Sequence, residues 1–147
     1  MTEFEALYSG RLWSVMGWDQ LTALWRRIDP AAGWYLLAVG ADETPTVAAD
    51  AAMVSAFIER IDTLLRTDHH ESYCGIVYAD DLEHPRLIKI YDPNNLGSSC
   101  GSSKNPPGPG WIMSRVPPEE IPAARPAPEN RKRWWQGLRE KRSFSEG

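Results

Sequence analysis

The sequence predicts an α+β fold, with a mostly antiparallel sheet of about four strands packed against two or three helices on one face. Three observations lead to this class. Helical patterns come first and strand patterns later, without the regular strand–helix alternation of parallel sheets. Two of the strand patterns are joined by a short polar turn, which is typical of a hairpin. A hydrophobic fraction of 42% and seven tryptophans supply enough apolar area for a core in a chain of 147 residues.

Three segments have apolar residues at helical spacing. The first covers residues 4–13, with apolar side chains at Phe4, Leu7 and Leu12. The second covers 19–28, with Asp19 where an N-cap is expected and Asp29-Pro30 directly after the helix. The third and clearest covers 47–67, where one apolar stripe faces away from the charged residues. Its stripe consists of Met53, Val54, Phe57, Ile58, Ile61, Leu64 and Leu65.

Four segments have the composition of strands. Residues 33–40 form a continuous apolar run bounded by glycines, whose length favours a buried strand. Residues 74–79 and 86–91 flank the polar turn and are expected to pair as a hairpin. Residues 111–116 are the fourth candidate, after a long loop rich in Ser, Gly and Pro at 98–110.

The chain is expected to divide into a globular domain, 1–116, a linker, 117–128, and a tail, 129–147. The linker holds five prolines in twelve residues, which favours an extended conformation. Residues 130–142 are expected to form a short basic helix. Residues 125–147 contain seven basic and three acidic residues, net +4, whereas residues 1–124 contain nine basic and seventeen acidic residues, net −8. The sequence therefore places a basic tail on an acidic body.

Composition excludes several functional classes. A sequence pI near 5.4 disfavours binding of DNA by the body, because phosphate neutralisation needs a basic face. No apolar run reaches the roughly 20 residues that span a bilayer, and Met1–Leu7 lacks a basic region followed by an apolar one. A cytoplasmic protein is expected. Two cysteines are too few for a disulfide scaffold.

The tail is the strongest candidate for a binding element. Trp134, Trp135 and Leu138 share one face of the expected helix, so they are the expected anchors in a groove of a larger protein. The basic side chains around them would steer the tail toward an acidic surface. The partner-binding set is Arg131, Lys132, Arg133, Trp134, Trp135, Leu138 and Arg139.

Other roles of the tail stay open. It could lie on an anionic membrane or hold single-stranded nucleic acid, although two or three apolar anchors are few for either role. It could also fold back on the acidic domain or remain solvated. The expected function is a small accessory or adaptor protein, in which the folded domain and the tethered tail bind one partner together.

A different class is suggested by the residues around the hairpin. A histidine that opens one strand and Asp92-Pro93 that closes its partner lie near each other in an antiparallel pair. This pattern is similar to the second half of papain-like and C39-like cysteine peptidases, where the acid orients the imidazole. In those families the nucleophile precedes this region, and no cysteine precedes Cys74 here. The alternative is a thiol- or histidine-dependent enzyme or redox sensor using His69, His70, Cys74, Asp92 and Cys100.

Residue spacing bears on two further kinds of site, a metal site and an anion site. The His and Cys residues do not match paired zinc-ligand arms, so no metal is expected. The loop 94–104 has small residues and Lys104 and could cradle an anion, but it lacks the order of a P-loop. The simplest interpretation of this segment is an exposed loop. No cofactor is expected.

Overall fold

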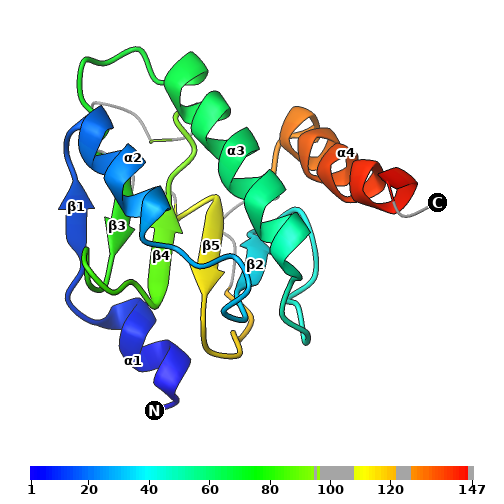
Figure 1. Ribbon diagram of the computed structural model, residues 1–147, viewed down its shortest axis with the longest axis horizontal. Helices are drawn as coiled ribbons and strands as arrows, with labels where there is room; N and C mark the ends of the chain where they lie inside the picture. Colours follow the sequence, from blue (N-terminus) through cyan, green and yellow to red (C-terminus); the bar gives the residue numbers. More distant parts are fainter. Residues whose placement is uncertain (95, 97–107, 122–126, 146–147) are drawn as a thin grey trace.

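A five-stranded antiparallel sheet with helices on both faces forms the molecule (Figure 1). The computed structural model describes residues 1–94, 96, 108–121 and 127–145, with side chains as far as Arg139. The strands are β1 (Trp13–Val15), β2 (Tyr35–Ala38), β3 (Val77–Ala79), β4 (Leu87–Ile90) and β5 (Trp111–Ser114). The helices are α1 (Glu3–Ser9), α2 (Trp18–Arg26), α3 (Ala51–Asp68) and α4 (Glu129–Ser145). The α+β class is confirmed, with five strands where about four were expected.

The strand order is β1-β3-β4-β5-β2, so β1 and β2 are the edges of the sheet. All four neighbouring pairs are antiparallel, and β3 and β4 form the expected hairpin, with Tyr78 opposite Lys89. Asp80 closes that hairpin, because its carboxylate accepts from the backbone N–H groups of Arg86 and Leu87. The polar turn thus fixes the register that the apolar pattern requires.

The fifth strand, β1, lies in a segment that was expected to be helical. The helix expected over 4–13 ends at Ser9, and Trp13–Val15 pairs with β3 instead. The helix prediction was therefore wrong for Trp13. Three residues are too short for the alternating pattern that identifies a strand, so only the pairing partner determines this conformation.

Alternate residues of the strands face two separate apolar clusters. Leu36, Ile88 and Met113 belong to the larger one, with α2, α3 and α4. Leu37, Leu87 and Ile112, one residue along, pack with Phe4 and Leu7 of α1 on the other face. The expectation that helices cover a single face was therefore wrong. Strands buried on both sides need the continuous apolar runs seen here.

Helix α2 begins one residue earlier than expected. Gly17 is the N-cap rather than Asp19, and the Gln20 side chain accepts from the backbone N–H groups of Met16 and Gly17, at 3.0 Å each. Asp50 caps α3 through the Met53 N–H at 2.9 Å, so this helix starts later than the apolar pattern suggested.

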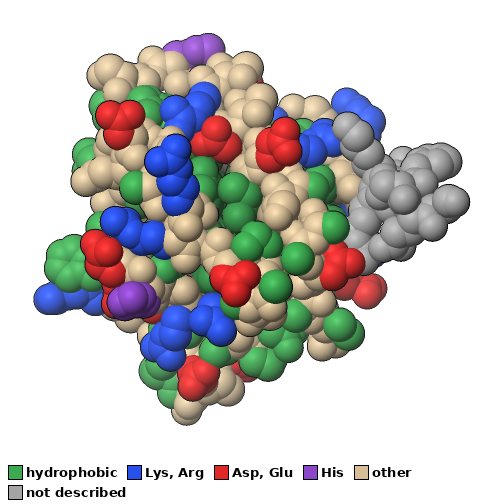
Figure 2. Space-filling model, in the orientation of Figure 1, with side chains coloured by type: hydrophobic (Ala, Val, Ile, Leu, Met, Phe, Trp, Pro, Cys, Tyr) green, Lys and Arg blue, Asp and Glu red, His purple; other side chains and the backbone are tan. Residues whose placement is uncertain are grey.

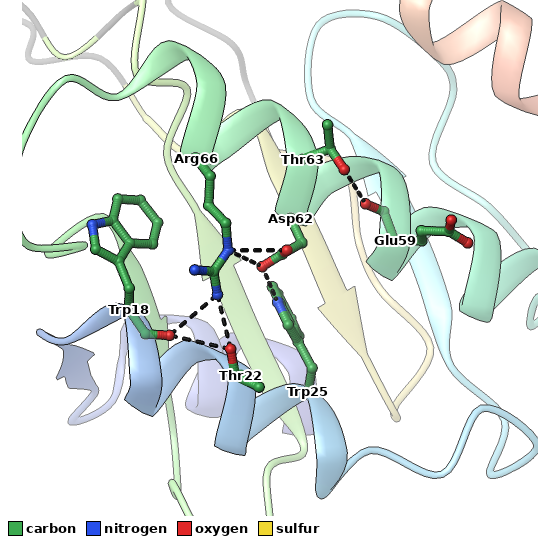
Figure 3. Close-up of polar contacts among 7 residues, drawn as sticks. All are labelled: Trp18, Thr22, Trp25, Glu59, Asp62, Thr63 and Arg66. Carbon is green, nitrogen blue, oxygen red and sulfur yellow. Dashed lines mark hydrogen bonds and ion pairs between the residues drawn. The ribbon is translucent and has the colours of Figure 1, made fainter.

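Polar contacts hold α2 against α3 (Figure 3). Asp62 accepts from the Trp25 indole at 3.0 Å and from Arg66 through both carboxylate oxygens. The Arg66 guanidinium also donates to Thr22 Oγ1 at 2.8 Å and to the Trp18 carbonyl, and it lies over the Trp18 ring. These bonds fix the orientation of Trp18, which contacts the segment that follows α3.

Candidate functional site

Helix α4 packs back onto the domain. It lies beside α3 on the right of Figure 1. Trp135 and Leu138 are 4% and 2% exposed, and the Trp134 and Trp135 rings meet Phe57 of α3 edge to face, with centroids 6.3 and 6.1 Å away. Trp134 also contacts the Trp111 ring of β5 at 5.5 Å. The anchors proposed for a partner are therefore occupied by this chain's own core, which is the fold-back arrangement left open above.

A buried ion pair joins α4 to the sheet. The Arg131 guanidinium donates from Nε and Nη2 to the two carboxylate oxygens of Asp92, at 2.9 and 3.0 Å, and from Nη2 to Asp68 at 2.8 Å. Arg131 and Asp92 are both buried. Burial lowers the pKa of Arg131, but the hydrogen bonds and charges of Asp92 and Asp68 outweigh this effect and raise it. The guanidinium therefore stays charged and holds α4 in place.

A second polar contact ties the middle of α4 to the segment after β2. Asp42 accepts from the Trp135 indole at 2.7 Å and pairs with Arg139. Burial acts to raise the pKa of Asp42, but the hydrogen bonds from Trp135 and the Glu43 N–H, with the charge of Arg139, lower it overall. Arg133 is exposed, and Lys132 is partly exposed beside Glu129. Among the described basic side chains of α4, Arg133 and Lys132 therefore lie on its outer side, whereas Arg131 and Arg139 bind acids of the domain.

The residues of the alternative catalytic cluster are held in separate contacts. His69 is buried, and its Nε2 lies 2.9 Å from the backbone carbonyl of Cys74 rather than from the thiol. Cys74 is fully buried, and this burial raises the pKa of the thiol. A raised pKa removes the thiolate that a nucleophile or redox thiol needs near neutral pH.

The remaining members of that cluster are placed as follows. Asp92 binds Arg131, so the structure brings it to the tail helix instead of an imidazole. His70 is exposed at the end of α3. Cys100 and most of the loop 94–104 lie outside the described residues. Within the described residues, no three His, Cys, Asp or Glu side chains are grouped so that they could hold a metal ion.

A group of exposed apolar side chains surrounds β1, and we call it the β1 rim: Trp13, Met16 and Tyr73. They are 50%, 52% and 47% exposed. The Met16 carbonyl accepts from the Cys74 N–H at 2.7 Å, which places Tyr73 beside the end of β1. Figure 2 shows hydrophobic side chains at the left margin, where Figure 1 places β1.

The segment that carries Tyr73 is held by contacts with Trp18 and His69. The Trp18 indole donates to the Glu71 carbonyl at 3.3 Å, and the His69 ring meets both the Trp18 and Tyr73 rings edge to face. Gly75 has a φ of +70°, and a Cβ there would lie 3.1 Å from the Tyr73 ring. The exposed ring is therefore held in place. Sequence reasoning missed this rim because the strand Trp13–Val15 was not recognised, and only its pairing with β3 brings the end of β1 beside the segment that carries Tyr73.

No helix in the described ranges is long and apolar enough to cross a membrane. Comparisons with protein-family models, with curated proteins and with solved structures found no match.

Proposed function

We propose that this chain is a small non-catalytic protein that binds a larger protein, and that the β1 rim is the contact surface of its folded domain. The observation that carries this proposal is the exposure of Trp13, Met16 and Tyr73, each about half exposed, along the edge strand β1 and beside its end. Aromatic and methionine side chains are enriched where proteins meet other proteins. Held aromatic rings lose little conformational entropy when a partner covers them.

The position of β1 supports an extended segment of the partner as the occupant. Among the described strands, β1 is an edge of the sheet with β3 as its one neighbour, and Figure 1 shows it at the left side of the sheet. The segment flanking the opposite edge strand, β2, is engaged by the chain itself, since the Trp34 carbonyl accepts from the Ala49 N–H at 2.8 Å. An unpaired strand edge offers backbone N–H and C=O groups to an incoming strand, while the flanking side chains give specificity.

The tail is the second contact of the expected adaptor, and its use in this role would require release of α4. Release would expose Trp135 and Leu138 and leave the buried Asp92 without Arg131. Burial of such side chains is worth about 1.5–3 kcal/mol each, so a partner must replace these contacts. In the docked state, Arg133 and Lys132 are left to steer an acidic partner toward α4.

The test compares three forms of the full chain in affinity purification, followed by reconstitution with the purified partner. We expect a stoichiometric partner with the wild type, and at least about tenfold weaker binding after Trp13→Ser with Met16→Ser, as for interface anchors. Val47→Ser is the matched control, because Val47 is an exposed apolar residue that is not part of the β1 rim.

Hydrogen exchange of the complex locates the contact. Protection of residues 13–16 on binding supports strand addition at β1. Equal binding by the double rim variant and by Val47→Ser would sink the proposal. Binding that survives the rim changes but fails with Arg133→Glu would move the contact to α4.

A further inference from the structure

Four polar side chains from three elements converge on the face of the sheet that α1 covers. Lys89 of β4 lies directly across from Tyr78 of β3. Tyr91 directly follows β4, and its ring meets the Tyr78 ring, while it also packs against the edge of the larger apolar cluster. Tyr8 comes from α1 and places its ring against Lys89, with Nζ 3.6 Å from the ring centroid. These residues, Tyr8, Tyr78, Lys89 and Tyr91, form what we call the lysine–tyrosine cluster.

Among the described residues, no carboxylate neutralises the ammonium of this cluster. Lys89 is partly buried, and among the described residues no Asp or Glu forms an ion pair with it. Burial lowers the pKa of Lys89, and no neighbouring acid counteracts this effect. The Tyr8 ring face stabilises the cation in part. It does not satisfy the three N–H donors of the ammonium, which need oxygen acceptors.

The phenols add neutral donors around this charge. The Tyr78 and Tyr91 rings meet edge to face with centroids 5.7 Å apart. Burial raises the pKa of both Tyr8 and Tyr91, and a neighbouring tyrosine raises each further, Tyr91 for Tyr8 and Tyr78 for Tyr91. The hydroxyls of Tyr8 and Tyr91 therefore stay protonated as donors. No hydrogen bond joins the hydroxyl group of Tyr8, Tyr78 or Tyr91 to another described residue.

We propose that the lysine–tyrosine cluster binds a small oxyanion, a carboxylate or phosphate group, between Lys89 and the hydroxyls of Tyr8 and Tyr91. The set offers one positive charge and several O–H and N–H donors, with no acidic acceptor. Charge-assisted hydrogen bonds to a carboxylate or phosphate satisfy such a set. The apolar surroundings strengthen them relative to water. The site lies on the opposite face of the sheet from α4, and it is independent of the β1 rim proposal.

Nuclear magnetic resonance titration of the full chain tests this site. Sodium phosphate and sodium acetate are added separately against sodium chloride at equal ionic strength, and the backbone amides of residues 78, 89 and 91 are followed. We expect saturable shifts in at least one oxyanion series and none in chloride. The responding anion tells a phosphate site from a carboxylate site.

Variants decide whether the cluster causes the shifts. Lys89→Met should weaken binding at least about tenfold, and Tyr91→Phe, which keeps the ring, several-fold. Lys132→Met is the matched control, because it removes one lysine charge from α4 on the other face of the sheet. Saturable binding that Lys89→Met leaves unchanged, or the absence of saturable shifts in both oxyanions, overturns the proposal. Tyr91→Phe guards against a folding defect in the lysine variant.

Discussion

At the residue scale, Arg131 joins two groups of residues that the sequence suggested for different roles. It belongs to the basic tail, and Asp92 belongs to the cluster that resembles a peptidase half-site. In the fold their side chains bind each other through two hydrogen bonds. A buried carboxylate is strongly destabilising when its counter-charge is removed. Asp92 therefore has a structural role, because its bonds to Arg131 join the segment after β4 to α4.

Replacing Arg131 tests this link. Arg131→Met should lower the free energy of unfolding by roughly 3–5 kcal/mol, because Asp92 is left buried without its partner. Urea denaturation measures the loss. Lys132→Met, which removes an exposed pair with Glu129, should change stability by about 0.5 kcal/mol or less. Similar losses in the two variants would contradict the buried pair. Addition of Asp92→Asn to Arg131→Met should recover part of the loss.

Asp42 gives the docked helix a dependence on pH. Its pKa is lowered in the fold, so its contribution to stability is complete above the ordinary carboxyl pKa of 3.8 and is lost as pH falls through the lower folded value. We expect wild-type stability to decline with acid below that ordinary value, and Asp42→Asn to decline less. Urea midpoints from pH 6 down to 2.5 measure this. Identical pH profiles for the two proteins would show that Asp42 is not the cause.

At the element scale, α4 illustrates how a polar helix depends on its neighbours. Its apolar anchors are few, and a helix of this length with so little apolar surface is marginal alone in water. Arg131, Trp134, Trp135 and Leu138 follow at helical spacing and meet α3 and β5. The same spacing that predicts a partner-binding face also fits this intramolecular contact. Only the fold of the domain decides between them.

The packing of α4 predicts a large effect of a single tryptophan. Trp135→Ala should lower the free energy of unfolding by about 3–5 kcal/mol, because it leaves a cavity beside Phe57 and removes the bond to Asp42. Gln136→Ala, at the neighbouring exposed position, should change it by roughly 0.5 kcal/mol or less. Guanidinium denaturation measures both. A tail that hangs free in solution would give equal, negligible effects.

At the scale of the whole molecule, opposite charges on the body and the tail lie within one fold. Asp42 binds Trp135 and Arg139 of α4. Asp68 and Asp92 both bind Arg131 of the same helix. The larger apolar cluster includes residues of the sheet, α2, α3 and α4 together. A shared cluster makes these elements unfold together.

We therefore expect a single unfolding transition that includes α4. Far-ultraviolet circular dichroism and hydrogen exchange of amides 131–139, followed through a urea series, should give the same midpoint. Exchange of the sheet amides serves as the internal reference. A lower midpoint for α4 would show that the helix leaves the domain before global unfolding, which would favour its use as a second partner contact.

The local patterns determined much of the architecture. The apolar stripe of α3, the 80–85 turn and the run in β2 each encode an element through side-chain period or turn chemistry, and these effects act over a few residues. The α+β class and the β3–β4 hairpin follow from them. The expected tail helix, 130–142, likewise matches α4 because its spacing is local. Residues 95 and 97–107 of the loop, including Cys100, lie outside the described residues.

Tertiary structure alone decided which surfaces meet. The sequence could name Trp135 and Arg131 as anchors, but only the packed domain shows that Phe57, Asp92 and Asp68 receive them. The strand at Trp13–Val15 and the exposure of Tyr73 also depend on β3, which is far along the chain. The lysine–tyrosine cluster needs α1, β3 and β4 together. The physical reason is that burial and pairing are properties of contacts distant in sequence, and the local pattern of a segment contains no information about its partner.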